Sequence, residues 1–197
     1  MPCTIVRLAG CPLRCRYCDT PQAQSFKAGK HISVETVCAE VAKRDRPLVL
    51  VTGGEPMAQP ETIALLTKLT TTHRIVQLET SGAFDLRQVP TAVHRIIDIK
   101  TPASGESERN HWQNLETLHE GDEIKFVICD KNDYVWSKEV IQSHASTFEN
   151  IPVLLSPMWQ AGYSIEQLVD WMLADNLPAR LQPQLHKIIW GAEAIGV

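Results

Sequence analysis

The chain has 197 residues, 44% of them hydrophobic, and a formal net charge of -4 at pH 7. This length and apolar content are enough for one sizeable core, so we predict a single domain over residues 1–197. The negative charge and the lack of a Lys/Arg block argue against nucleic-acid binding and favour a small-molecule partner. We find neither a secretory signal nor an apolar run long enough to span a membrane, so we expect a cytoplasmic protein with no membrane partner.

Short β-branched runs recur along the chain and predict strands. They cover residues 4–8, 48–52, 74–79, 95–100, 123–129 and 152–155. The first of these runs leads directly into a segment rich in cysteine.

Helical patterns fill the intervals between these strands. They cover residues 61–69, 108–118 and 134–143. An earlier helix begins after Ser33, which is a suitable N-cap. Its apolar face consists of Val34, Val37, Cys38 and Val41.

The last clear helix begins with a capping box, in which Ser164 is the N-cap and Gln167 is the reciprocal partner. The side chains predicted to pack inward from it are Ile165, Leu168 and Met172.

This alternation of strands and helices predicts an α/β fold with a parallel sheet and right-handed crossovers. About six such units are too few to close an eight-stranded barrel, so we predict an open, partial (β/α)6-type barrel. Ligands of such sheets bind at the carboxyl ends of the strands.

Three cysteines, Cys11, Cys15 and Cys18, follow the first predicted strand with C-x3-C-x2-C spacing. A structural zinc site uses four protein ligands, whereas a cubane cluster held by three thiolates keeps one iron open. The incomplete set therefore indicates a working metal centre. A zinc site completed by His31 stays open as an alternative, while a disulfide is disfavoured because the pattern fits a reducing compartment.

The other three cysteines are predicted to be structural. Cys38 lies on the apolar face of a helix and Cys129 ends a strand, so both fit small buried hydrophobes. Cys3 precedes a strand, and its separation from Cys11 matches no common ligand spacing.

Polar motifs follow several predicted strands. The segment 52–56 reads Thr-Gly-Gly-Glu-Pro, and its paired glycines fit either a plain turn or the close approach of a ligand. The segments 79–82 and 98–102 place hydroxyl groups and a lysine at comparable positions. We expect these segments to meet at one edge of the sheet.

Later strands end in a similar way. Lys125, Ser156 and Pro157 occupy comparable positions. Polar residues occur again at 182–187, where His186 fits a functional role and a structural role equally well.

The cysteine segment resembles the signature of the radical S-adenosylmethionine (SAM) enzymes, in which an aromatic residue, here Tyr17, precedes the last cysteine. The Gly-Gly-Glu-Pro segment at 53–56 matches the part of these enzymes that binds the amino group of SAM. In that superfamily the open iron binds SAM, and an electron from the cluster cleaves SAM to a 5′-deoxyadenosyl radical. The resemblance implies hydrogen-atom abstraction, with an electron donor such as flavodoxin or ferredoxin.

A larger set of segments resembles the 7-carboxy-7-deazaguanine synthase family, over essentially the whole chain. These segments are residues 7–11, 18–20, 52–56, 79–82, 98–102 and 183–187. The resemblance implies a radical SAM lyase that converts 6-carboxy-5,6,7,8-tetrahydropterin to 7-carboxy-7-deazaguanine with loss of ammonia, in the queuosine pathway. It also implies a bound magnesium ion and a homodimer.

The same resemblance implies roles for individual residues. The implied ligands of the [4Fe-4S] cluster are Cys11, Cys15 and Cys18. The implied SAM contacts are Gly54, Ser81 and Lys100. The implied substrate contacts are Arg7, which can pair with the pterin carboxylate, and Thr52, while Thr20 is the implied magnesium ligand. No side chain is assigned as a catalytic acid or base.

This family usually begins with a leading segment that contains a Gln-Gly-Glu-Gly turn and forms part of the substrate pocket. The sequence given starts at Met1, directly before the first strand. Either the start codon has been assigned too late or this is a truncated copy, and we expect in-frame coding sequence upstream to encode such a segment.

Two other functions share some of these features. A glycyl-radical activating enzyme has the same cysteine and Gly-Gly-Glu-Pro motifs, but Arg7, Thr20 and Thr52 fit a small anionic substrate and its metal. A non-catalytic zinc or iron–sulfur binding module is disfavoured by the three-ligand set.

Overall fold

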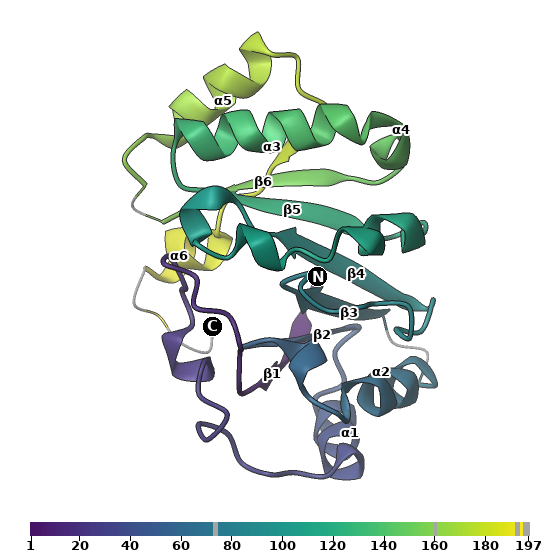
Figure 1. The fold of residues 1–197 in the computed structure, drawn as a ribbon. Helices are drawn as coiled ribbons and strands as arrows, with labels where there is room; N and C mark the ends of the chain where they lie inside the picture. The colour runs from purple at the N-terminus through teal and green to yellow at the C-terminus, as the bar shows by residue number, and fades with distance from the viewer. Residues whose placement is uncertain (73–74, 160, 192–193, 195–197) are drawn as a thin grey trace.

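A computed structural model describes residues 1–72, 75–159, 161–191 and 194. Its centre is one seven-stranded sheet, in which all neighbouring strands are parallel and follow the order of the chain (Figure 1). The strands are β1 (Cys3–Leu8), β2 (Leu48–Gly53), β3 (Ile75–Thr80), β4 (Val93–Ile99), β5 (Glu123–Ile128), β6 (Val153–Pro157) and β7 (Arg180–Leu181). The predicted open, partial barrel is confirmed, since β1 and β7 are the two edges of the sheet.

Helices or short 3-10 helices lie in the connections between the strands, except between β3 and β4, where the described chain forms neither. The α-helices are α1 (Val34–Arg44), α2 (Thr62–Thr70), α3 (Lys131–Ser143), α4 (Ala145–Phe148), α5 (Ile165–Ala174) and α6 (Leu185–Trp190). The 3-10 helices are η1 (Pro21–Ala23), η2 (Pro56–Ala58), η3 (Pro102–Ser104), η4 (Ser107–Arg109) and η5 (Trp112–Thr117). In the described part of the chain, no helix is long and apolar enough to cross a membrane.

Two predicted helix starts are confirmed by their caps. The Ser33 side chain accepts a hydrogen bond from the Thr36 backbone N–H at the start of α1. Ser164 and Gln167 form the complete capping box of α5. Each cap satisfies backbone donors that the first turn of a helix leaves without a partner.

The prediction of one helix over residues 108–118 is wrong, because the chain forms the short turns η4 and η5 there. Two asparagine side chains of this segment form hydrogen bonds with backbone groups that lie outside it. Asn110 exchanges hydrogen bonds with the backbone of Lys100, and Asn114 donates to the carbonyls of Gly82 and Phe84. Such side-chain bonds hold the segment against the strand ends and compete with a regular helix.

The prediction that Ile165 packs inward is wrong, since this residue is 39% exposed. Leu168 and Met172 of the same helix are buried as predicted. The sheet edge beside α5 is β7, which has only two residues and covers little of the helix. The sequence did not predict this seventh strand. Of the other strands, the bounds differ from the prediction by one or two residues, and Arg74 lies outside the described residues.

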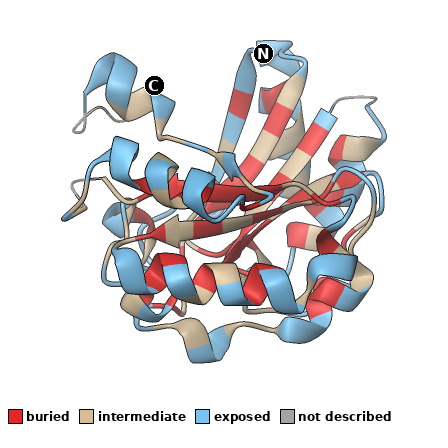
Figure 2. Ribbon diagram, turned by 90° about the horizontal axis from the view of Figure 1, so that it is seen from above, coloured by how far each residue is buried: buried red, intermediate tan, exposed pale blue. Residues whose placement is uncertain are grey.

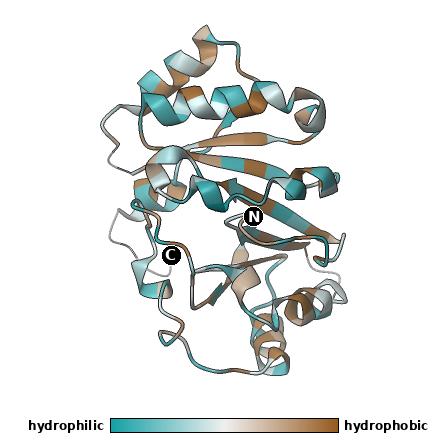
Figure 3. Cartoon of the chain, in the orientation of Figure 1, coloured by the Kyte–Doolittle hydropathy of each residue, from teal (hydrophilic) through white to brown (hydrophobic). Residues whose placement is uncertain are grey.

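Burial and hydropathy vary from residue to residue along the strands (Figures 2 and 3). Since successive side chains of a strand point to opposite faces, the two faces of the sheet differ in character. One face packs against the helices and forms the apolar core. Its strand residues include Val49, Val51, Val76, Leu78, Ile97, Ile124, Phe126, Ile128, Val153 and Leu155. The opposite face is polar near the carboxyl ends of the strands, where it carries Thr52, Glu79, Asp98, Lys125 and Ser156.

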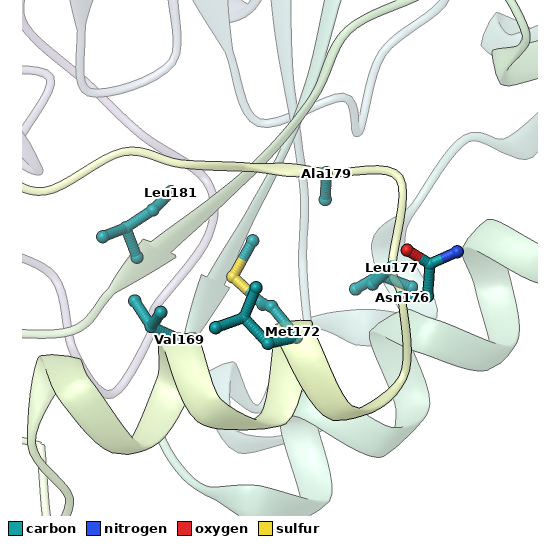
Figure 4. A pocket seen from close by; sticks show the side chains of 7 residues that line it. Val169, Met172, Asn176, Leu177, Ala179 and Leu181 are labelled. Atoms are coloured by element: carbon teal, nitrogen blue, oxygen red, sulfur yellow. The ribbon is translucent and has the colours of Figure 1, made fainter.

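Two surface hollows lie away from this polar face. One, of about 190 Å³, lies between α5 and β7 and is lined by Val169, Met172, Leu173, Asn176, Leu177, Ala179 and Leu181 (Figure 4). The other, of about 550 Å³, lies at the amino ends of β2 and β3 and includes Cys38, Pro47 and Ile75. Neither contains a residue that the sequence predicts to bind cofactor or substrate.

A fully buried ion pair joins β4 to the turn before β5. The side chains of Arg95 and Asp122 are 2% and 0% exposed, and the Arg95 Nε lies 3.1 Å from both carboxylate oxygens. Asp122 also accepts from the backbone N–H groups of Arg95 and His119, each at 3.0 Å. Both Asp122 carboxylate oxygens accept hydrogen bonds, so the pair is tolerated in the core. Removing either partner would leave the other charge buried and unpaired, which is strongly destabilising.

We predict that Asp122→Ala lowers the free energy of unfolding by about 3–5 kcal/mol, because it leaves the Arg95 charge buried without its partner. Chemical denaturation followed by circular dichroism measures this change. The matched control is Asp85→Ala, which removes the exposed pair between Asp85 and Arg87 and should change stability little. Equal losses in the two variants would contradict the assignment of the buried pair as a fold-determining contact.

Candidate active site

The segment with the three clustered cysteines lies between β1 and α1, at the carboxyl edge of the sheet. Its start is bonded to its own η1 turn, through Gly10 N–H to Ala23 O at 2.8 Å and Cys11 N–H to Gln24 O at 3.0 Å. Gly10 has a φ of 98°, a conformation that favours glycine. We call residues 9–24 the cysteine loop.

The cysteine loop is also bonded to the turn after β4. Arg16 donates its backbone N–H to Ser104 O at 3.0 Å, and Arg14 donates its backbone N–H to Glu106 Oε1 at 2.5 Å. Leu13, which is 1% exposed, anchors the same stretch. The loop is therefore held across the carboxyl edge of the sheet from β1 to the segment that follows β4.

The three thiols of this loop are free and half-buried. Burial raises the pKa of Cys11, and it raises that of Cys15 to about 11 although the Lys100 ammonium acts in the opposite direction. No described group of three His, Cys, Asp or Glu side chains could hold a single metal ion, so His31 does not complete a preformed zinc site with these cysteines. Each thiolate of a cubane binds a different iron, so a cluster does not need the three sulfurs to converge on one point.

The Gly-Gly-Glu-Pro segment packs directly against the cysteine loop. Gly54 donates its N–H to Leu8 O and Glu55 donates its N–H to Gly10 O, both at 2.8 Å. A Cβ on Gly54 would lie 2.4 Å from Gly10 O and 2.6 Å from Ala23 O. The glycine is therefore required by this backbone contact, a role that differs from both sequence-based interpretations, a plain turn and the approach of a ligand.

Glu55 extends the contact to the end of β3. Its side chain is fully buried and accepts from the Thr80 hydroxyl at 2.8 Å and the Ser81 N–H at 2.7 Å. It also caps η2 by accepting from the Met57 N–H. As a result Gly54 and Ser81, two predicted SAM contacts, lie in one hydrogen-bonded unit with the cysteine loop.

Lys100, the third predicted SAM contact, lies just past β4 and is buried. Its Nζ is 3.2 Å from Asp98 Oδ2. Burial alone would lower the pKa of Lys100, but the ion pair with the Asp98 carboxylate raises it. Lys100 is thus a charged ammonium group next to the cysteine loop.

Further charges on the polar face form a set that sequence reasoning did not assign. Lys125 of β5 contacts the carboxylates of Glu79 on β3 and Asp98 on β4. Thr52 of β2 donates to the other oxygen of Glu79 at 3.3 Å. The sequence signal for this set is a polar residue on each of β2, β3, β4 and β5, on the face opposite the apolar residues.

The predicted substrate contacts, Arg7 and Thr52, are neighbours. They are partners in the register of β1 and β2, and Arg7 is exposed on the edge strand. Thr52 is buried beside Glu79. The register therefore places Arg7 on the same face of the sheet as Thr52, whose hydroxyl contacts the Glu79 carboxylate.

Thr20, the predicted magnesium ligand, lies at the start of η1, where its hydroxyl is 3.5 Å from Asp19 Oδ1. The other oxygen of Asp19 accepts from Gln184 Nε2 at 3.0 Å, and Lys187 Nζ is 4.0 Å away. The polar segment 182–187 therefore lies against the cysteine loop, as Figure 1 shows for α6. The sequence did not predict this contact between Asp19 and Gln184.

Comparison with known proteins agrees with this geometry. The model of the Radical SAM superfamily matches residues 5–99. A 7-carboxy-7-deazaguanine synthase of Chlorobaculum tepidum is 41% identical over 100% of this chain and 89% of its own length. One of Koribacter versatilis is 38% identical over 100% of this chain and 92% of its own length. The chain belongs to the 7-carboxy-7-deazaguanine synthase family.

Solved structures with the same fold include Streptococcus suis SuiB bound to S-adenosylmethionine, with a TM-score of 0.66 and 12% identity. That match covers 95% of this chain and 52% of SuiB, so it shows the fold alone. The 7-carboxy-7-deazaguanine synthase family consists of radical SAM lyases, and the chain is an enzyme of this type. Its cofactors are accordingly a [4Fe-4S] cluster and SAM, which the three half-buried thiols and the adjacent polar edge fit.

We predict that Gly54→Ala destabilises the cysteine loop, by about 1–3 kcal/mol, because the added methyl group overlaps two backbone carbonyls. After anaerobic reconstitution, the variant should bind less iron per chain and show a weaker cluster absorbance. Gly162→Ala is the matched control, since nothing lies within 4 Å of its added Cβ. Full iron content in Gly54→Ala would show that the loop does not depend on this contact.

Proposed function

We propose that this protein converts 6-carboxy-5,6,7,8-tetrahydropterin to 7-carboxy-7-deazaguanine with release of ammonia, in 7-deazapurine biosynthesis. The observation that carries the proposal is the placement of Arg7 beside Thr52 at the strand edge that also bears the cysteine loop. The full-length similarity to 7-carboxy-7-deazaguanine synthases supports the choice of reaction. The continuous seven-stranded sheet supports a single radical SAM domain over residues 1–197.

The proposed ligands of the cluster are Cys11, Cys15 and Cys18. Their half-buried thiols must lose protons on binding iron, so cluster assembly is expected to be favoured by higher pH. When bound at these thiols, the cluster together with SAM would supply the chemistry for hydrogen-atom abstraction from the pterin. The protein's part is to hold the reacting groups in position and to exclude water.

The proposed SAM contacts are Gly54, Ser81 and Lys100. The N–H groups of Gly54 and Ser81 are already used within the protein, so contact with SAM would come from the Gly54 carbonyl and the Ser81 hydroxyl. A carbonyl suits the amino group of SAM, and the Lys100 ammonium supplies positive charge for a carboxylate.

The proposed substrate contacts are Arg7 and Thr52. The Arg7 guanidinium can donate two parallel hydrogen bonds to the pterin carboxylate, which a lysine could not match in geometry. The Thr52 hydroxyl is oriented by its bond to Glu79. Together these groups would fix one end of the substrate relative to the cysteine loop.

We also propose a magnesium ion at Thr20. A hydroxyl is a weak ligand by itself, and the Asp19 carboxylate 3.5 Å from it supports the choice of a hard cation there. Magnesium keeps several water or substrate oxygens as ligands, so a site with few protein groups is sufficient.

The electron donor and the oligomeric state complete the proposal. We propose a flavodoxin or ferredoxin as donor and a homodimer as the assembly. The exposed apolar residues of α6, Leu185, Ile188, Ile189 and Trp190, support a subunit contact at this helix.

The function is tested by incubating the anaerobically reconstituted protein with SAM, a reductant, magnesium and 6-carboxy-5,6,7,8-tetrahydropterin. We predict 7-carboxy-7-deazaguanine and an equal amount of ammonia, both measured against time by liquid chromatography, mass spectrometry and an ammonia assay. SAM cleavage that leaves the pterin unchanged would contradict the proposed reaction and favour a protein substrate.

Thr20→Val tests the magnesium site, because it keeps the shape of the side chain and removes its oxygen. We predict that about tenfold more magnesium is then needed for half-maximal turnover, at an unchanged iron content. Thr36→Val, at an exposed position of α1, is the control for the same substitution. An unaltered magnesium requirement in Thr20→Val would remove this residue from the site.

A further inference from the structure

Lys125 is a half-buried lysine to which the proposed function gives no role. It lies on β5, and its side chain is only 14% exposed. Its ammonium group contacts Glu79 on β3 and lies 3.3 Å from Asp98 Oδ2 on β4. Since β4 lies between β3 and β5, the lysine side chain reaches across one whole strand to bind Glu79.

The charges around Lys125 are balanced. Two ammonium groups, those of Lys100 and Lys125, face two carboxylates, those of Asp98 and Glu79. Asp98 Oδ2 is shared, at 3.2 Å from Lys100 and 3.3 Å from Lys125. Removing Lys125 would leave two carboxylates with one cation in a region of low water access, which is costly for the ionised forms.

Glu79 is the member of this set that is open to a ligand. Its side chain is 31% exposed, compared with 11% for Asp98. One of its oxygens binds Lys125, and the other accepts from Thr52. The carboxylate is thus oriented from two sides, and its position next to Thr52 places it at the proposed substrate contacts.

We propose that Lys125 is a positioning residue, which holds the Glu79 carboxylate ionised and turned toward the Thr52 side of the polar face as a hydrogen-bond acceptor for the substrate. This inference rests on the proposed function, because the ligand that Glu79 serves is the pterin.

The electrostatics agree with the geometry. The pKa of Glu79 is lowered chiefly by the Lys125 charge, against the effect of burial, with smaller contributions from Thr52 and Lys100. The charged groups that face Glu79 are therefore Lys125 from β5 and Lys100 after β4. Asp98 contacts both of these lysines. Without Lys125, burial raises the pKa of Glu79, and the carboxyl becomes protonated at higher pH than in the native protein.

The kinetic test compares Lys125→Met with Lys125→Arg in the reconstituted enzyme. We expect Lys125→Met to raise the KM for the pterin about tenfold or more, as for loss of a charged hydrogen-bond acceptor. The acid limb of kcat/KM should move to higher pH, whereas Lys125→Arg keeps the charge and should restore the native profile. Lys138→Met is the matched control, because Lys138 pairs with Asp175 on the outer helices and should not change KM or the pH profile.

An infrared titration of the same reconstituted proteins without pterin is independent of turnover. Lys125→Met should show the carbonyl band of a protonated carboxyl at a pH where the native protein lacks it. The band should be missing in Lys125→Met/Glu79→Gln. If Lys125→Met does not fold, Lys125→Gln takes its place in both measurements.

The outcomes separate this inference from the proposed function. Failure of the native protein to turn over the pterin would overturn the proposed function, and with it the pterin as the ligand of Glu79. The infrared result would still decide whether Lys125 keeps Glu79 ionised. A folded Lys125 variant with native KM and pH profile, or with no Glu79-dependent band, would overturn the positioning role.

Discussion

The arrangement of the active site depends on one close backbone contact, between the cysteine loop and the Gly-Gly-Glu-Pro segment. Gly54 donates its N–H to Leu8 O at the end of β1, and Glu55 donates its N–H to Gly10 O in that loop. The loop carbonyls of Gly10 and Ala23 leave no room for a Cβ at position 54. The buried Glu55 side chain then bonds the end of β3. Three motifs that are far apart in the sequence thus form one hydrogen-bonded unit.

The parallel sheet explains why these motifs meet. All seven strands run in the same direction, so every strand ends at the same edge. The apolar face of the sheet is covered by helices and supplies the core, which frees the opposite face for polar groups. Buried charges on that face are tolerated because carboxylates and ammonium groups are matched in number and contact one another. The same contacts orient the groups that we propose to face the substrate.

Much of the fold could be predicted from sequence, because it follows from local patterns. The strand runs, the Ser33 cap and the Ser164 capping box all depend on neighbouring residues, and the structure confirms them. The segment 108–118 was predicted wrongly because Asn110 and Asn114 bind backbone groups that are distant in sequence. Ile165 was misassigned because the extent of the sheet beside α5 is a tertiary property.

The candidate site could likewise be predicted only in part. The cysteine spacing and the paired glycines are visible in the sequence, and so are Arg7 and Thr52 as strand residues. Their meeting was implied by family resemblance alone, and the register of β1 and β2 now supplies the physical reason. The link from Glu79 across β4 to Lys125 could not be predicted, since it requires the strand order and the reach of one side chain. The contact of Asp19 with Gln184 joins residues at opposite ends of the chain and left no local signal.

The central claim is that this edge of the sheet binds SAM and the pterin together, with Arg7 and Thr52 on the pterin. An anaerobic crystal structure of the reconstituted protein with SAM and 6-carboxy-5,6,7,8-tetrahydropterin tests it most directly. The account predicts the pterin carboxylate within hydrogen-bond distance of the Arg7 guanidinium, and the cluster bound by Cys11, Cys15 and Cys18. A pterin bound away from the polar face, or a cluster held by other residues, would contradict it.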